Sequence, residues 1–429
     1  MARHHPTPMT VGAVPIRAEQ SAAPRVHLVA GTAGLVLWSV FLAVEGRGLA
    51  AGWLGNPVVL TAVHLAALAW ATTVAMGAAY QLLPVALGAP APLTSLGYLS
   101  FACFYPGSWL LAGGFWSGLP QLLALGGALI TVGVYVFAAA VLTGVAGVRR
   151  WTPSAAFLTA AVVYLAGAVT WGLTMALDLN FGFWPLQLSR DLGFHLLLAL
   201  GGWFTLLIIG VSYTLLPMFF LSDRAAGRTA WSVFALLNVG LIGLAVAIWL
   251  GSPAARVAAV AVVWLGLVLW LWDLQAILGR RRRRGRDVPL RHAVAGALAM
   301  TLAVTWALGM LAGLLPAGGR EVLAAGYLFL VGGVSSTIMG HLYRVAPFLI
   351  WVSRYAPRVG RGPVPLVRQL LREGWQEPAF WAFGLGVVGA LAGLVSAAAG
   401  LLAAGLILQA VGAVLFGGNI LAAFAPRRG

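Results

Sequence analysis

The sequence contains no lysine and a single cysteine. All 26 basic residues are therefore arginines, and the formal net charge of +16 is carried by guanidinium groups. Because Cys103 is alone, no intramolecular disulfide and no cysteine metal cluster can form. The stretch 1–25 lacks an apolar core, which argues against a cleavable signal peptide. We expect the first span to serve as its own insertion signal.

Charged side chains are also scarce. Only 8% of the 429 residues are charged, 61% are hydrophobic, and the mean hydropathy is +0.95. A soluble domain of this length could not bury so much apolar surface behind so little polar cover. Repeated apolar runs of 18 or more residues are instead typical of helices that cross a bilayer. The sequence therefore predicts an all-α polytopic membrane protein, with lipid as the solvent for most of its surface.

The apolar runs predict twelve transmembrane helices in a single domain over 26–424. A disordered cytoplasmic tail is expected at 1–25 and a short cytoplasmic tail at 425–429. The predicted spans lie at about 27–46, 57–84, 93–114, 119–147, 153–178, 192–221, 229–250, 254–279, 289–315, 321–350, 378–399 and 402–424.

Arginines are distributed unequally between the two sides of these spans. The loops on one side hold only four of them, namely Arg47, Arg190, Arg256 and Arg320. The opposite loops and both tails hold the rest, except Arg344, which lies near the inner end of the tenth span. By the positive-inside rule, both termini lie in the cytoplasm and the protein resides in the inner (cytoplasmic) membrane. This topology accounts for the basic charge, so no nucleic-acid partner is expected.

One segment occurs three times. The stretch from His64 to Pro84 aligns without a gap with Leu197 to Pro217, and more faintly with Tyr327 to Pro347. All three share G-x-x-Y-x-x-x-P at offsets of 133 and 130 residues, in Gly77/Tyr80/Pro84, Gly210/Tyr213/Pro217 and Gly340/Tyr343/Pro347. The copies fall on the second, sixth and tenth predicted spans. We therefore expect three related blocks of four helices, 26–150, 151–287 and 288–424.

His64 and His195 are the first candidates for chemistry. Both lie in the outer third of repeat-related spans, 20 and 22 residues before the repeated proline. A histidine inside a span is either hydrogen-bonded to a neighbouring helix or a ligand, and neutral imidazole suits iron or copper in a dry site. At about 100° per residue, their faces differ by about 160°. They therefore face either one shared gap or two separate gaps.

His341 and Arg344 lie deeper, near the cytoplasmic end of the tenth span. His341 is a further candidate metal ligand or a member of a cytoplasm-side polar cluster. Arg344 either extends its side chain to the interface or binds a carboxylate such as a haem propionate. His27 and His292 stand at cytoplasmic edges of spans, where an interfacial position is expected.

Together these features resemble subunit I of the haem-copper oxidase and nitric oxide reductase superfamily. The likeness covers nearly the whole chain as architecture, and it is clearest in His64 to Pro84. That stretch resembles the second helix of the family, which carries a low-spin haem ligand. By position, His195 corresponds to a histidine that ligates copper or non-haem iron in the family.

Two departures from the family limit what the resemblance implies. The tenth span reads Ala325, Gly326 and Tyr327 where the family has His-x-His. The seventh begins TAWSVFALLN, 229–238, and lacks the expected His-His pair. A complete oxygen-reducing centre is therefore not expected.

The resemblance implies an integral membrane protein that binds haem b, with His64 and His195 as ligands, and that transfers electrons or handles nitric oxide or oxygen. Such a protein would be an oxidoreductase of this type, with a cytochrome or a cupredoxin as electron donor. The alternative is a haem-free transporter or scaffold that keeps only the fold.

Overall fold

The computed structural model describes residues 22–89, 93–148, 150–222, 227–282 and 287–425, and every named element in these ranges is a helix. The first half contains α1 (Ala22–Glu45), η2 (Gly46–Ala51), α2 (Pro57–His64), η3 (Leu65–Thr72), α3 (Thr73–Ala86), α4 (Thr94–Ser117), α5 (Pro120–Ala146), α6 (Pro153–Phe181), α7 (Leu188–Leu196), η4 (Leu197–Thr205) and α8 (Leu206–Phe220). The second half contains α9 (Arg228–Trp249), α10 (Pro253–Gly279), α11 (Val288–Leu311), α12 (Gly319–Tyr327), η5 (Leu328–Ser335), α13 (Ser336–Arg354), η6 (Ala356–Arg358), η7 (Val367–Leu370), η8 (Glu373–Trp375), α14 (Gln376–Val395) and α15 (Ala399–Phe424).

The predicted all-helical, multi-pass membrane protein is confirmed. In the described part of the chain, eleven helices are long and apolar enough to cross a membrane. They correspond to eleven of the twelve predicted spans. The remaining predicted span, at about 93–114, corresponds to α4, a helix of 24 residues outside that set of eleven. Helix α1 begins at Ala22, inside the predicted tail, while residues 1–21 and 426–429 of the two predicted tails lie outside the described residues.

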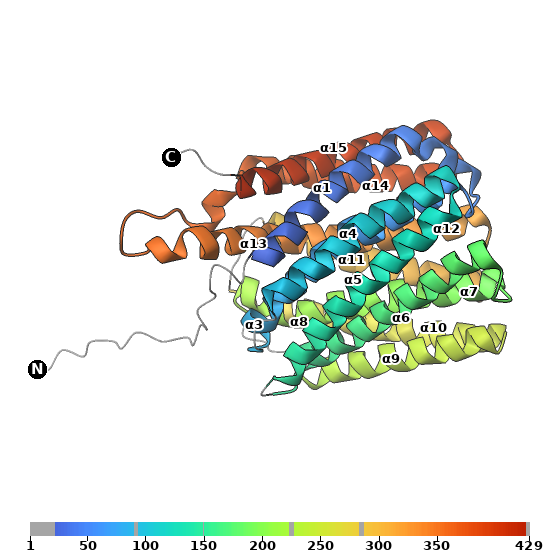
Figure 1. Cartoon of the computed structure of the whole chain (residues 1–429), viewed down its shortest axis with the longest axis horizontal. Helices are drawn as coiled ribbons and strands as arrows, with labels where there is room; N and C mark the ends of the chain where they lie inside the picture. Colours follow the sequence, from blue (N-terminus) through green and yellow to red (C-terminus); the bar gives the residue numbers. More distant parts are fainter. Residues whose placement is uncertain (1–21, 90–92, 149, 223–226, 283–286, 426–429) are drawn as a thin grey trace, which may run out of the picture.

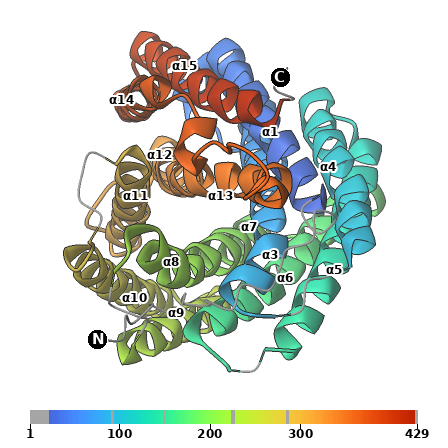
Figure 2. The ribbon, with the colours of Figure 1, turned by 90° about the vertical axis from the view of Figure 1, so that its left-hand side faces the viewer.

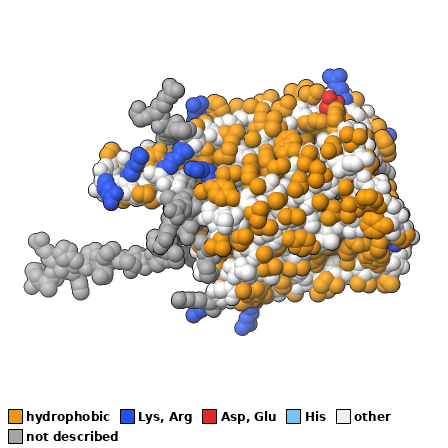
Figure 3. All heavy atoms as spheres, in the orientation of Figure 1, with side chains coloured by type: hydrophobic (Ala, Val, Ile, Leu, Met, Phe, Trp, Pro, Cys, Tyr) orange, Lys and Arg blue, Asp and Glu red, His pale blue; other side chains and the backbone are white. Residues whose placement is uncertain are grey.

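The lateral surface of the helical bundle is apolar, as lipid contact requires. Hydrophobic side chains cover the face shown in Figure 3, while arginines lie at its two ends. Exposed side chains such as Val239, Ile242 and Val388 point away from the core in the middle of their helices. Exposed arginines Arg358 and Arg361 belong to the segment that projects beyond one end of the bundle in Figure 1.

Three helices start with the same local chemistry. α2, α6 and α10 each have proline at the first position, where the missing N–H needs no partner. The residue before the proline caps the helix, since its side-chain oxygen accepts a bond from a backbone N–H two or three residues on. The capping residues are Asn56, Thr152 and Ser252. The predicted starts at about 57, 153 and 254 lie within one residue of these capped turns.

The helices are arranged as a ring around three inner helices. Figure 2 looks along the bundle and shows α3, α8 and α13 toward its middle. The outer helices form three neighbouring pairs, α4 with α5, α9 with α10, and α14 with α15. Each pair is joined to the next helix of the ring, since α5 contacts α6, α10 contacts α11, and α15 contacts α1.

Helix α4 runs antiparallel to α5 over most of its length. A Cβ on Gly133 of α5 would lie 2.8 Å from the Cβ of Phe104, and one on Gly114 of α4 would lie 2.8 Å from the backbone N of Leu123. These contacts span eleven residues of each helix, 104–114 of α4 and 123–133 of α5. In Figure 1, α1 begins and α15 ends at the same end of the bundle.

Each inner helix is continuous with a π-helical segment. These segments are η3, η4 and η5, and all three end 12 residues before the repeated proline. A π segment shifts the register of the helix and is frequently found at functional sites. The prolines themselves, Pro84, Pro217 and Pro347, lie inside α3, α8 and α13 rather than ending them.

The G-x-x-Y motif follows from helix packing. A Cβ added at each repeated glycine would come within 3 Å of the Cβ of a histidine or phenylalanine on α1, α6 or α11. Only glycine therefore permits this approach of the two helices. The repeated tyrosine lies within 6.1 Å of the same ring, measured between centroids. The three pairs of glycine and ring residue are Gly77 with His27, Gly210 with Phe157, and Gly340 with His292.

Candidate functional site

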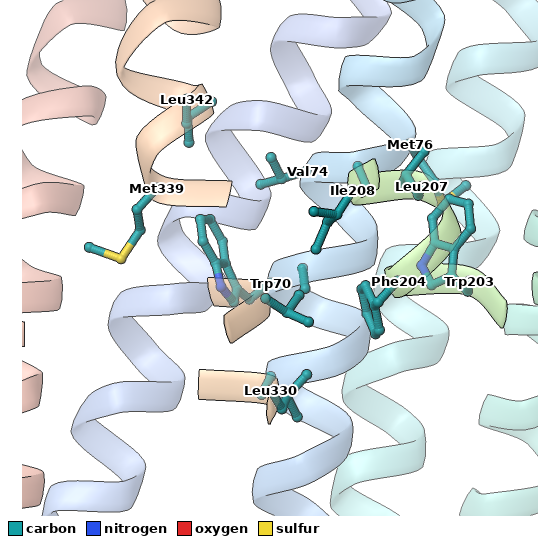
Figure 4. Packing of buried hydrophobic residues seen from close by; sticks show 14 of the residues in the cluster. Trp70, Val74, Met76, Trp203, Phe204, Leu207, Ile208, Leu330, Met339 and Leu342 are labelled. Carbon is teal, nitrogen blue, oxygen red and sulfur yellow. The ribbon is translucent and has the colours of Figure 1, made fainter. Parts of the chain in front are cut away.

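A cavity of about 70 Å³ lies where α3, α8 and α13 meet. Its lining is mostly aliphatic, with one threonine and one histidine. Positions ten, nine and six residues before the repeated proline line it on all three helices. The lining residues are Val74, Ala75, Ala78, Leu207, Ile208, Val211, Leu215, Thr337, Ile338, His341, Leu342 and Val345. Figure 4 shows several of the apolar side chains that pack around this junction.

His341 supplies the only imidazole of this lining. Its Nδ1 lies 2.8 Å from the carbonyl oxygen of Thr337, one turn earlier on α13. Because a carbonyl only accepts, Nδ1 carries the proton and Nε2 carries a lone pair in the neutral ring. Nε2 is buried and has no hydrogen-bond partner. The other polar lining group, the Thr337 hydroxyl, donates to the carbonyl of Gly333 at 2.9 Å.

Two indole hydrogen bonds join the inner helices next to the cavity. Trp203 donates through Nε1 to the hydroxyl of Thr72 at 3.0 Å, and Trp70 donates to the hydroxyl of Ser335 at 3.1 Å. Both tryptophans are buried and belong to the hydrophobic core around the junction (Figure 4). Each bond connects two of the three π-helical segments. Trp70 and Trp203, which both lie 14 residues before the repeated proline, therefore link neighbouring copies of the repeated segment.

His64 ends α2, directly before η3. Its Nδ1 lies 2.7 Å from the carbonyl oxygen of Leu60, which again leaves the lone pair on Nε2. The ring stacks on Phe115 of α4, with centroids 4.6 Å apart and planes inclined by 27°. Such a fixed orientation and tautomer is what a metal-ligating histidine obtains from a hydrogen bond to its other nitrogen.

His195 lies near the end of α7, with its ring against α6. A Cβ on Gly172 of that helix would be 3.0 Å from Cε1 of the imidazole. The ring also interacts with the backbone carbonyl of Ala168, while Nδ1 is buried without a hydrogen-bond partner.

His64 and His195 each lie within two residues of the start of a π segment, whereas His341 lies beyond the π segment, in α13. His64 and His341 differ by 14 positions in the repeat alignment, roughly 21 Å along a helix at 1.5 Å per residue. Across the described ranges, no three His, Cys, Asp or Glu side chains form a group that could hold a metal ion. The three predicted ligands do not form one metal site.

Arg344 lies one turn beyond His341 and forms an ion pair with Asp287, directly before α11. Its guanidinium and the carboxylate are both partly buried. The predicted role of Arg344, binding a carboxylate, is filled here by a side chain of the same protein. Any propionate would compete with Asp287 for this guanidinium.

His27 and His292, expected at the membrane interface, are fully buried by neighbouring parts of the protein. Each lies edge-on to a phenylalanine, Phe101 and Phe380 respectively, within 5.0 Å between centroids.

The apolar cavity was also missed from sequence. Its lining residues are ordinary core residues, and only their equivalent spacing before the three prolines marks them. The chain matches no protein-family model, and no curated protein is significantly similar to it. The function is therefore argued from the geometry.

Proposed function

We propose that the chain is a twelve-helix protein of the inner membrane, built from three four-helix blocks like subunit I of the haem-copper oxidases. The antiparallel course of α4 against α5 supports a twelfth crossing. The beginning of α1 and the end of α15 lie at one end of the bundle, as an even number of crossings requires. Three equivalent π segments and three equivalent glycine contacts support the blocks.

The orientation follows from the arginines. The bundle end that carries Arg354, Arg358 and Arg361 faces the cytoplasm under the positive-inside rule. His64 and His195 then lie toward the opposite, outer face.

We further propose that the protein binds one haem b and that His64 is its axial ligand. The carrying observation is the imidazole of His64, whose Nδ1 is held by the Leu60 carbonyl and whose Nε2 bears the lone pair. His195 is the second candidate ligand because it lies on the equivalent span, two residues from the level of His64 in the repeat alignment. A bound haem supplies reversible one-electron chemistry and an iron that can take a diatomic gas.

The protein side chains would have three tasks at this site. His64 would hold the iron through Nε2, while the backbone carbonyl of Leu60 and the ring of Phe115 fix its imidazole. The apolar helices exclude water, which favours a neutral ligand set. Arg344 would not contact a haem held by His64. In the repeat alignment Arg344 lies 17 residues beyond the level of His64, roughly 25 Å along a helix.

The test is an absorption spectrum of the detergent-purified protein from cells supplied with ample haem. We expect a Soret band, lost in His64→Ala and retained in the matched control His341→Ala. His341 has the same Nδ1 bond to the preceding turn but lies far from the site. A colourless wild-type protein would refute the proposal and select the haem-free transporter or scaffold. A Soret band that survives His64→Ala combined with His195→Ala would refute this placement of the haem.

A further inference from the structure

We infer that the cavity between α3, α8 and α13 binds one small apolar molecule without hydrogen-bonding groups, of the size of a short hydrocarbon such as ethane. The surface of the cavity is almost entirely carbon, and this chemistry defines the class of ligand. The site does not depend on haem. The lining positions six residues before the repeated prolines lie 14 residues from the level of His64 in the repeat alignment, roughly 21 Å along a helix.

The two polar residues of the lining offer almost no polar surface to a ligand. Nε2 of His341 is buried, and Nδ1 of the same ring bonds to the carbonyl oxygen of Thr337. The hydroxyl of Thr337 donates to the carbonyl of Gly333, and the residue is only 4% exposed. A polar ligand would therefore give up its hydrogen bonds to water without gaining others, which is unfavourable.

Water and ions are unsuited to the cavity for the same reason. A buried water typically bonds to about three polar partners, and this surface does not supply them. The described lining residues include no charged side chain, so an ion would lose its hydration without compensation. Apolar cavities without such partners stay dry and take up apolar molecules.

The volume limits the ligand to a few heavy atoms. Apolar cavities of about 150 Å³ take up benzene or xenon. This cavity, at about 70 Å³, has about half that volume. A hydrocarbon of about two or three carbons therefore fits, whereas a benzene ring does not.

The cavity is closed at one end and accessible at the other. In the layer ten residues before the repeated prolines the three lining side chains are buried, namely Val74, Leu207 and Thr337. Trp70 and Phe204 are also buried and lie near this layer, on the side of the π segments (Figure 4). In the layer six residues before the prolines the three lining side chains are partly exposed, namely Ala78, Val211 and His341. A ligand therefore enters from the side of the prolines, and the buried layer stays in place.

The experiment follows the δ1-methyl resonances of Ile208 and Ile338, which both line the cavity, in isoleucine-labelled protein in lipid nanodiscs. Each resonance is assigned by its loss in the corresponding Ile→Val variant. Ethane under pressure is the probe, and methanol, which has the same number of heavy atoms but is polar, is the matched control. We expect ethane to shift both resonances in a saturable way, with a dissociation constant on the order of 10 mM or weaker, as befits two heavy atoms. Methanol at the same concentrations should cause no saturable shift.

An internal control separates the cavity from ethane dissolved in the bilayer. Ile242 of α9 is 59% exposed on the lateral surface of the bundle. Its methyl resonance should change in proportion to the ethane pressure and should not saturate.

Two variants test the location of the site. Ala78→Leu adds three carbons inside the cavity, and Ala392→Leu makes the same change on the exposed face of α14. We expect the first to weaken the ethane response at least tenfold and the second to leave it unchanged. Val345→Phe is the substitute filling variant if Ala78→Leu does not fold.

The inference is overturned if ethane causes no saturable shift of Ile208 and Ile338, because water or a lipid chain then fills the cavity. It is also overturned if the filling variants respond like the wild type, or if methanol and ethane act alike. A colourless protein would refute the haem proposal and leave these outcomes unaffected.

Discussion

Gly340, the repeated glycine of α13, packs closely against α11. This contact yields a quantitative prediction for Gly340→Ala. The new Cβ would lie 2.6 Å from the carbonyl oxygen of Pro289, 2.9 Å from the Cβ of His292 and 3.1 Å from the backbone N of Ala293. Carbon atoms in favourable contact are about 3.5–4.0 Å apart. Two of the three obstacles are backbone atoms, so no side-chain rotation can relieve the clash. Helices α11 and α13 must move apart.

Two opposing effects set the size of the change. Alanine favours a helix over glycine by about 1 kcal/mol, which stabilises the variant. Overpacking a close contact costs about 1–3 kcal/mol, and the backbone contacts here favour the upper part of that range. We expect the free energy of unfolding of Gly340→Ala to fall by about 1–2 kcal/mol after both effects are combined.

The matched control is Gly326→Ala on α12, the same continuous span. A Cβ at Gly326 would meet nothing within 4 Å, so only the helix preference acts, and stability should stay equal or rise. The assay is unfolding by SDS in mixed micelles, followed by the fluorescence of the 18 tryptophans. Equal stabilities of the two variants would contradict the close approach of α11 and α13 and, with it, the explanation of G-x-x-Y.

Three further predictions concern single contacts. In a double-mutant cycle, Trp203→Phe and Thr72→Val should show a coupling energy of about 0.6 to 1.7 kcal/mol, between the average and the maximum for hydrogen bonds between membrane helices. A coupling energy near zero would contradict a stabilising hydrogen bond between these two side chains. Arg344→Gln should destabilise the protein by about 1–3 kcal/mol because Asp287 loses its ion pair, and adding Asp287→Asn should restore part of that loss in the same SDS assay. If α4 crosses the membrane, an impermeant maleimide should label Ser95→Cys and Ser117→Cys, each in a Cys103→Ser background, from opposite sides of sealed vesicles; labelling from one side only would contradict the twelfth crossing.

Composition and periodicity determined the class of this protein. Apolar runs of span length with few charges leave a helix as the only way to satisfy the backbone in lipid, so the multi-pass helical fold could be predicted directly. The starts of α2, α6 and α10 were equally accessible. They depend on a capping residue followed by proline, a signal confined to a few neighbouring residues.

The site was predictable only in part. His64 and His195 stood out because histidine is rare and costly within a span, and their common level followed from residue counting. Whether they share a region could not be decided from sequence, because a face offset of about 160° fits both arrangements. The relative rotation of α2 and α7 depends on the packing of α2 against α4 and of α7 against α6, contacts that join separate segments of the chain.

Tertiary structure alone decided the roles of the other residues. Arg344 is next to Asp287 only because α11 and α13 pack together, although 57 residues separate them. The cavity exists because three helices, far apart in the chain, place small and aliphatic residues at one junction around His341. The sequence by itself determined where each helix runs, since that depends on neighbours in the chain. Which faces of those helices meet depends on contacts between distant residues, and these only the folded structure shows.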